Sequence, residues 1–489
     1  MTDRGQGADL TGLFAPNSIA VVGASSREGR PGHFVLQALT TMGPEGSIYP
    51  ITPRYDEILG LACHHDIESA PAFDLAIIAS ASERIEADLE AVAAHGARGA
   101  VIFGAPVPDE RRSPWLERLA AIARSANLAL LGPDSLGFVN FDGRVAATWS
   151  LPEPSPAGGI AVVSQSGTVY WEANTNDPRL RFSFTGHSGL EATLSMAELI
   201  RYCLELPSTR VVGIYVETIR DVESFVGALE LAADQGVPVV ALYAGRTEQA
   251  RAQMMTHAGR LAGSRASLEG LFRRYGVVRA ESPDDWWTTL ALLGGDRTLG
   301  DGGLAAVMDS GGGLAMFLDF AYELGVPLAQ LSPATTTQLH DLLGIEQART
   351  GALDFWIGDR DRHSVTSNLV QVLADDPGTA AVMAFTTYAE IPRAGFAGNV
   401  ADSVLAARAA TTKPIVAATY TSRQVSPALM LALSDEGVPI LDGMRAGVQA
   451  MRHAFDVREF SSTRHTTNRE IHVDADVVRE RLMSRPQLL

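Results

Sequence analysis

The stretch Ile19-Ala20-Val21-Val22-Gly23-Ala24-Ser25-Ser26 is a short apolar strand followed directly by a loop of small and hydroxylated residues. The same arrangement returns at residues 160–167 and 304–313, where each apolar run again leads into serine and glycine. A strand, a Gly/Ser loop and a helix in this order are typical of the opening unit of a doubly wound α/β domain. The three openings predict three consecutive α/β domains.

Further apolar runs of strand length fill out each domain. Such strands are apolar at nearly every position because helices cover both faces of a parallel sheet. The predicted strands span residues 47–51, 75–79, 100–103, 128–131, 211–216, 237–243, 380–385, 415–418 and 438–441. Helical patterns alternate with them, for example at residues 85–95 and 224–235.

Two stretches rich in proline or glycine, at residues 151–159 and 294–303, indicate linkers. With 489 residues the chain is long enough for about three domains that each bury a core. The predicted domains are residues 1–150, 151–300 and 301–460, followed by a polar C-terminal tail at residues 461–489.

The composition narrows the classes of partner and compartment. A net charge of -18 disfavours nucleic acid and anionic membranes as partners. The two cysteines, Cys63 and Cys203, form neither a disulfide framework nor a zinc-binding pattern, so no metal site is expected. The N-terminus has no signal-peptide core and no run of about 18 apolar residues occurs, so we expect a cytoplasmic protein.

The first Gly/Ser loop has the parts of an anion cradle. Gly23, Gly29 and Gly32 lie between the first strand and its helix, together with two serine hydroxyls and the free N–H groups of a helix start. The glycines do not have the G-x-G-x-x-G spacing of a dinucleotide fingerprint. A purely structural turn between strand and helix is the alternative interpretation.

The end of the second predicted strand indicates which ligand the loop would bind. NAD-binding folds usually carry Asp or Glu at this point, for the ribose hydroxyls. Here the residues are Thr52-Pro53-Arg54, and a cation favours a ligand with a phosphate on its ribose. Coenzyme A and NADP both qualify, and the alternative is that Arg54 is a solvated surface charge.

In this order, the motifs resemble the alpha subunit of succinyl-CoA synthetase and, more closely, the CoA-binding half of ADP-forming acyl-CoA synthetases. The resemblance extends from about residue 13 to about residue 452. The motifs that carry it are Gly23-Ala24-Ser25, Tyr49-Pro50, Pro53-Arg54, Gly132-Pro133-Asp134-Ser135-Leu136-Gly137, Val163-Ser164-Gln165-Ser166-Gly167, Tyr215-Val216-Glu217, Ala244-Gly245-Arg246, Thr256-His257-Ala258-Gly259, Leu261-Ala262-Gly263 and Ser310-Gly311-Gly312.

The resemblance implies a fold and a ligand for the first domain. It implies an N-terminal Rossmann-like domain that binds coenzyme A, followed by two flavodoxin-like domains of the succinyl-CoA synthetase type. The residues expected near coenzyme A are Gly23, Ala24, Ser25, Gly29, Pro53, Arg54, Ala79 and Ser80.

The resemblance also implies a phosphohistidine. His257 is matched to the histidine that carries the phosphoryl group, and Glu217 to the carboxylate that orients it. The phosphate-binding loop is matched to Ser164, Gln165, Ser166 and Gly167. This chemistry is physically reasonable, because a carboxylate that accepts from one ring nitrogen leaves the other nucleophilic, while a helix start supplies N–H donors to the phosphate.

The implied activity is acyl-CoA synthesis from a small carboxylic acid, coenzyme A and a nucleoside triphosphate. Because the three α/β domains account for the length, ATP and Mg²⁺ are expected on a separate ATP-grasp subunit, in a hetero-oligomer. Two other readings remain open: an NADP-dependent oxidoreductase, and a non-catalytic CoA-binding or regulatory protein of the same fold.

Several positions depart from the family pattern. The family usually has Gly-Asn-Glu-Ala-Asp where this chain has Gly189-Leu190-Glu191-Ala192-Thr193. It commonly has Lys at Tyr243, Asn-Pro-x-Asp at Gly351-Ala352-Leu353-Asp354, Val-Pro at Ala79-Ser80, and Cys at Ser135. These departures leave the identity of the carboxylic acid open.

Overall fold

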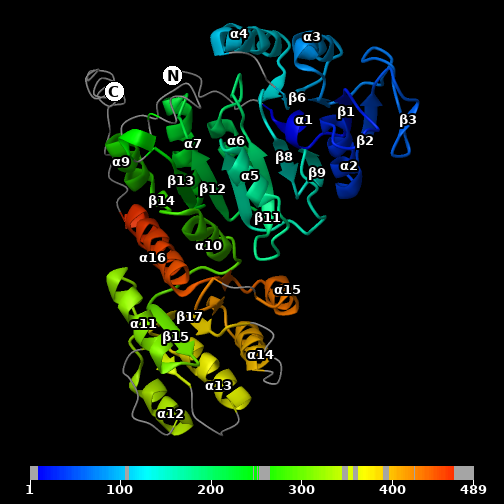
Figure 1. Cartoon of the computed structure of the whole chain (residues 1–489). Helices are drawn as coiled ribbons and strands as arrows, with labels where there is room; N and C mark the ends of the chain where they lie inside the picture. Colours follow the sequence, from blue (N-terminus) through cyan, green and yellow to red (C-terminus); the bar gives the residue numbers. More distant parts are fainter. Residues whose placement is uncertain are drawn as a thin grey trace. The chain divides into compact units, whose positions relative to one another are not determined.

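The computed structural model describes residues 9–104, 109–245, 247–250, 252, 265–343, 351–355, 362–388, 396–422 and 425–466. These residues form two compact units, and Figure 1 labels many of their helices and strands. Of the described residues, unit 1 holds those up to Asp177 together with those of Phe182–Tyr275, and unit 2 holds Pro178–Arg181 together with those from Gly276 to Thr466. The predicted α/β fold with parallel-sheet domains is confirmed.

The first sheet of unit 1 is parallel throughout and has the strand order β2-β1-β5-β6-β7. Val22 at the end of β1 is in register with Ile51 of β2 and Ile78 of β5, so the loops after these three strands start at one edge. The elements are α1 (Thr11–Phe14), β1 (Ser18–Val22), α2 (Pro31–Met42), β2 (Ser47–Ile51), β3 (Glu57–Ile58), β4 (Leu61–Ala62), β5 (Leu75–Ile78), the 3-10 helix η1 (Ser82–Arg84), α3 (Ile85–Ala94), β6 (Gly99–Ile102), α4 (Asp109–Ser125) and β7 (Ala129–Leu131).

The second sheet of unit 1 mixes parallel and antiparallel strands. Strands β13, β12, β10 and β11 are parallel neighbours in that order, and β8 and β9 extend the sheet antiparallel beyond β11. The sheet thus includes two strands from the range predicted for the first domain. The elements are β8 (Gly137–Asn140), β9 (Val145–Thr148), β10 (Ile160–Ser164), α5 (Gly167–Ala173), β11 (Phe182–His187), α6 (Met196–Glu205), β12 (Val211–Val216), α7 (Val222–Gln235), β13 (Val239–Tyr243) and α9 (Arg265–Tyr275).

Local sequence specifies where the helices of this second sheet begin and end. The side chain of Ser195 accepts a hydrogen bond at the start of α6 and forms a capping box with Glu198. Asp221 caps α7 by accepting from the Ser224 N–H at 3.0 Å. Gly236 ends α7 with φ of 70°, a conformation that glycine adopts without a steric penalty.

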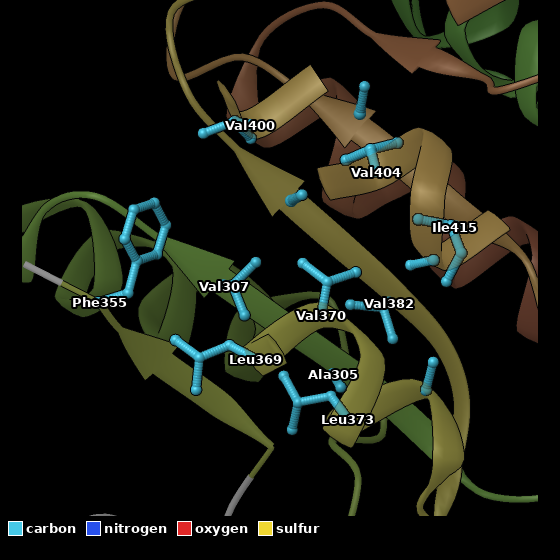
Figure 2. Packing of buried hydrophobic residues seen from close by; sticks show 14 of the residues in the cluster. Ala305, Val307, Phe355, Leu369, Val370, Leu373, Val382, Val400, Val404 and Ile415 are labelled. Carbon is cyan, nitrogen blue, oxygen red and sulfur yellow. The ribbon is translucent and has the colours of Figure 1, made fainter. Parts of the chain in front are cut away.

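Unit 2 contains the third sheet, which is parallel with the order β16-β15-β17-β18-β19. Figure 2 shows one side of its core, where Val370 of α13 lies near Val307 of β15 and Val382 of β17. The elements of unit 2 are β14 (Val278–Arg279), α10 (Pro283–Leu293), β15 (Gly303–Met308), α11 (Gly311–Glu323), α12 (Pro333–Leu343), β16 (Ala352–Asp354), α13 (Arg362–Asp375), β17 (Thr379–Phe385), α14 (Phe396–Ala410), β18 (Ile415–Ala418), α15 (Pro427–Asp435), β19 (Ile440–Leu441) and α16 (Met444–Thr466). The range predicted as a tail therefore begins inside α16.

Candidate functional site

The loop after β1 and the start of α2 pack so closely that one position in each requires glycine. Gly23 has φ of 86°, and a Cβ there would lie 2.9 Å from the backbone nitrogen of Ser80. A Cβ on Gly32 would lie 2.3 Å from the carbonyl oxygen of Gly23. Side chains at either position would push the loop away from the sheet edge, which is where ligands bind in open α/β sheets.

The residues predicted to contact coenzyme A lie on three loops at this one edge. Gly23, Ala24, Ser25 and Gly29 follow β1, Pro53 and Arg54 follow β2, and Ala79 and Ser80 follow β5. The N–H groups of Gly23 and Ala24 both donate to the Ile51 carbonyl, at 3.1 and 3.2 Å, which ties the first loop to the second. β1 is flanked by β2 on one side and β5 on the other, so this edge is a topological switch point.

Polar groups at this edge include an exposed arginine and two buried atoms that lack a hydrogen-bond partner among the described residues. Arg54 is exposed, and the Ser80 hydroxyl is buried without a hydrogen-bond partner in the described part of the chain. The Nδ1 atom of His33, in the first turn of α2, is also buried and unpartnered among the described residues. Buried polar atoms are nearly always hydrogen-bonded in folded proteins, so these two atoms favour a polar ligand at this edge.

The second Gly/Ser loop, after β10, is held by its own side chains. The Ser164 hydroxyl donates to the Ser166 carbonyl at 2.8 Å and accepts from the Ser166 N–H at 3.0 Å. Ser166 is the N-cap residue of α5, yet its hydroxyl does not cap the helix. What remains for an anion is the Ser166 hydroxyl and the N–H groups of the helix start at Gly167, which have no partners within the helix.

Gln165 is engaged elsewhere than at this helix start. Its carboxamide oxygen accepts from the N–H groups of Glu217 and Thr218, at 2.7 and 2.9 Å. Its NH₂ group donates to the Thr218 carbonyl and to Glu191, both at 2.8 Å. The structure therefore brings the predicted phosphate loop and Glu217 together, with Gln165 as the link.

The sequence reading assigned no role to Glu191. This carboxylate is buried, with 7% of the residue exposed, and accepts from Gln165 and from the Ser188 hydroxyl at 2.8 Å. Arg220 lies 3.7 Å from its other oxygen. Burial raises the pKa of Glu191, while the hydrogen bonds and Arg220 act in the opposite direction. In the sequence, Glu191 stands in the family motif at residues 189–193, where the positions on either side of it differ from the family.

His187 ties three segments together at the same place. Its Nδ1 accepts from the Leu136 N–H at 3.0 Å, and its Nε2 lies 3.3 Å from the Gln165 carbonyl. Nδ1 is an acceptor, so the ring is neutral and its remaining proton is on Nε2. Burial lowers the pKa of His187 to about 4. These contacts give His187 a structural role.

The depressed pKa of His187 predicts a loss of stability in acid. The His187 side chain takes up a proton near pH 6.5 in the unfolded chain but only near pH 4 in the folded chain. The contribution of His187 to folding stability is therefore complete above pH 6.5 and is lost as the pH falls from 6.5 to 4. A difference of this size is worth up to about 3 kcal/mol. The free energy of unfolding, measured by urea titration, should fall more between pH 7 and pH 5 for the wild type than for His187→Gln, in which residue 187 cannot titrate. Equal slopes for the two proteins would contradict the assignment.

His257 lies outside the described residues, so its role stays a prediction. Among the residues that are described, no group of three or more His, Cys, Asp or Glu side chains could hold a metal ion. No helix in the described ranges has the length and apolar character needed to cross a bilayer.

Two family models match the chain. A CoA binding domain matches residues 17–140, and a succinyl-CoA ligase like flavodoxin domain matches residues 157–293. These ranges contain the two loop clusters described above.

Relatives of known activity match most of the chain. It is 30% identical to acetate–CoA ligase (ADP-forming) I of Archaeoglobus fulgidus over 383 residues, which cover 77% of this chain and 54% of that protein. It is 26% identical over 413 residues to the alpha subunit of acetate–CoA ligase (ADP-forming) I of Pyrococcus furiosus, covering 78% of this chain and 88% of that subunit. The chain spans about half the length of the first curated relatives it matches.

A solved structure extends the similarity over the whole fold. The dinucleotide forming acetyl-coenzyme A synthetase 1 of Ca. Korarchaeum cryptofilum, in complex with phosphate and ADP, superposes with a TM-score of 0.83 at 23% identity. The match covers 95% of this chain and 100% of that one. At this identity the comparison shows a shared fold.

Proposed function

Because the chain belongs to the NDP-forming acyl-CoA synthetase superfamily, we propose that it is the CoA-binding, alpha-type subunit of such an enzyme, with His257 as phosphate carrier. The observation that carries the proposal is the Gln165 carboxamide, which joins the Ser164–Gly167 loop to the strand end bearing Glu217. The proposed reaction needs the phosphate-binding loop to lie near the carboxylate that orients the histidine, and the Gln165 contacts hold the two segments together.

The proposed reaction proceeds in three balanced transfers. The γ-phosphoryl group of the nucleoside triphosphate passes to a ring nitrogen of His257, releasing the diphosphate. A carboxylate oxygen of the acid then attacks phosphorus, forming an acyl phosphate and freeing His257. The CoA thiol attacks the acyl carbon, releasing inorganic phosphate and giving the thioester.

Each described residue has a defined part in these steps. Glu217 accepts a hydrogen bond from the far nitrogen of the His257 ring, which fixes the tautomer and stabilises the developing positive charge. The Ser166 hydroxyl and the helix start at Gly167 donate to the phosphate oxygens. The loops after β1, β2 and β5 hold coenzyme A, with Arg54 on the ribose phosphate.

The nucleotide and Mg²⁺ belong, in this proposal, to an ATP-grasp subunit. The Pyrococcus relative is named as an alpha subunit, which supports a division of the enzyme between chains. The Archaeoglobus relative is a longer chain, of which this one matches about half. Reconstituted with an ATP-grasp subunit, this chain should support phosphate release that requires ATP, acid and CoA together. Phosphate release without added CoA thiol or acid would contradict the coupling.

Arg54→Ala is expected to weaken CoA binding by about 1.5–3 kcal/mol, because a charge-assisted hydrogen bond to the ribose phosphate is lost. Dephospho-CoA, which lacks that phosphate, should bind both proteins with the same affinity. Titration calorimetry with the two ligands measures the difference, and Arg124→Ala, which removes an exposed arginine on α4, is the matched control. An equal loss of affinity for both ligands would show that Arg54 does not contact the ribose phosphate. Tight binding of NADPH in place of CoA would favour the oxidoreductase alternative.

A further inference from the structure

The Gln165 side chain uses its full hydrogen-bonding capacity inside the protein. A carboxamide has two donor hydrogens and can accept two hydrogen bonds. The donors serve Glu191 and the Thr218 carbonyl, and the acceptor serves the N–H groups of Glu217 and Thr218. The main chain of Gln165 is fixed too, since its N–H donates to the Tyr215 carbonyl at 3.2 Å. No other common side chain offers both functions with this geometry.

Glu191 is the one side chain among these partners, and it helps to fix the orientation of that carboxamide. An amide group could rotate by half a turn and exchange its oxygen and nitrogen, but a buried carboxylate beside it accepts only from the nitrogen. Glu191 is itself held by the Ser188 hydroxyl and lies within 3.7 Å of Arg220. Its φ of 52° is in the left-handed region, which non-glycine residues rarely adopt. A buried acid in an uncommon backbone conformation is costly, so its presence here favours a role beyond packing.

We propose that Glu191 and Gln165 form a buried relay that positions Glu217 for its work on the phosphate-carrying histidine. Glu191 orients the Gln165 carboxamide, and the carboxamide holds the backbone of Glu217 and Thr218 at the end of β12. Since Gln165 also precedes Ser166 and Gly167, the relay keeps the phosphate loop and the Glu217 backbone in one fixed relation. This inference rests on the proposed function, because it assigns Glu191 and Gln165 as positioning residues for that reaction.

The residue types at both relay positions follow from this role. In Glu191→Gln the side chain keeps its size and can still accept from Gln165, but its amide can also turn its NH₂ group toward Gln165. Residue 191 then no longer fixes the orientation of the Gln165 carboxamide, and only the backbone groups of Glu217 and Thr218 do. In Gln165→Glu the two donors are lost and two carboxylates meet in a buried site. The second change should therefore be the more damaging one. The double variant Gln165→Glu with Glu191→Gln restores one amide–carboxylate pair, although the Thr218 carbonyl still lacks its donor.

A double-mutant cycle separates positioning from general support of the fold. Single-turnover phosphorylation by ATP and an ATP-grasp subunit is measured for the wild type, Glu191→Gln, Glu217→Gln and the double variant. If Glu191 acts through Glu217, Glu191→Gln alone slows the step by about tenfold or more, as small misplacements of catalytic groups do. In the Glu217→Gln background the same change should cost less than about twofold, since no carboxylate remains to be positioned. The CoA dissociation constant should stay unchanged throughout.

Amide hydrogen exchange gives a readout that needs no partner subunit. The relay predicts faster exchange at Glu217 and Thr218 in Glu191→Gln, with unchanged exchange in the middle of β12. Ser188→Ala, which removes one hydrogen bond to Glu191, serves if Glu191→Gln does not fold, and should show the same pattern more weakly.

The outcomes distinguish this inference from the function on which it rests. Equal effects of Glu191→Gln in both backgrounds, or unchanged exchange at Glu217 and Thr218, would overturn the relay while leaving the phosphohistidine proposal intact. A wild-type chain that takes no phosphoryl group from ATP under these conditions would overturn the proposed function and the relay with it. Labelling of the wild type together with a non-additive cycle supports both.

Discussion

His257→Asn is expected to abolish acyl-CoA synthesis by the partnered enzyme while leaving CoA binding intact. Asparagine is close to imidazole in polarity, but it has no nitrogen that can take a phosphoryl group from a nucleotide and return it to a carboxylate. The predicted CoA residues lie on the first sheet of unit 1, in loops that do not include residue 257. The loss should therefore appear in kcat, to below about one part in 10³ of the wild-type rate.

The measurement is CoA-thioester formation under saturating ATP, acid and CoA, with CoA affinity followed separately by calorimetry. His65→Asn is a matched control, because His65 is exposed, belongs to none of the predicted sites and undergoes the same chemical change. A His257→Asn enzyme with ordinary turnover would contradict the phosphohistidine mechanism. Loss of CoA binding in this variant would mean that the two sites are not separate.

Glu217→Gln is expected to slow phosphoryl transfer by roughly 10²-fold, with little change in the melting temperature. The amide can still accept a hydrogen bond from the ring, but it cannot stabilise the imidazolium charge that develops as phosphorus bonds to the other nitrogen. Its backbone N–H to Gln165 is unaffected by the substitution, so the strand end should keep its geometry. Glu217 is partly exposed and close enough to Tyr215 that its charge adds to burial in raising the pKa of that phenol.

Rapid-quench measurement of phosphoenzyme formation tests the Glu217 prediction, with Glu90→Gln as a matched change of an exposed acid on α3. The Glu217 variant should accumulate phosphoenzyme slowly and its KM for ATP should change little. Identical rates for wild type and Glu217→Gln would reduce Glu217 to a surface acid at the end of a strand.

The strands that the sequence predicted well are those with continuous apolar character. Residues 211–216 match β12 in full, and residues 47–51 match β2. Strand β11 was missed because Ser183 and Thr185 interrupt its apolar pattern, although both are fully buried. The Ser183 hydroxyl pairs with that of Thr209 at 2.7 Å, and Thr185 donates to Asn174 at 3.2 Å. Side-chain partners brought by folding make buried hydroxyls acceptable, and no local pattern reveals such partners.

Strands β8 and β9 were missed for a different reason. Each has four residues and forms an antiparallel hairpin within the range predicted for the first domain. Their place in the second sheet depends on the pairing of β8 with β11, more than 40 residues along the chain. Linker composition at residues 151–159 indicates a break in the chain but carries no information about such long-range pairing.

The candidate site shows a similar division. The order of the motifs was enough to group Gly23, Arg54 and Ser80 in one expected site and the Ser164–Gly167 loop with Glu217 in another. The structure places the members of each group close together. The positions of the Gln165 side-chain contacts could not be predicted. Its four hydrogen bonds go to three residues in the loops after β11 and β12, which only the fold brings together. Glu191 matches the glutamate of the family motif at residues 189–193, but the sequence does not reveal its burial or its partners.

The central claim is that a phosphoryl group from ATP comes to rest on His257, and labelling tests it most directly. The chain is mixed with an ATP-grasp subunit, Mg²⁺ and γ-labelled ATP without acid or CoA, and the label is located by peptide mapping. The account predicts label on the peptide that contains His257, stable in base, lost in acid, and discharged when carboxylic acid and CoA are added. Label on a serine, label that survives acid, or no label on a chain that still makes acyl-CoA would contradict it.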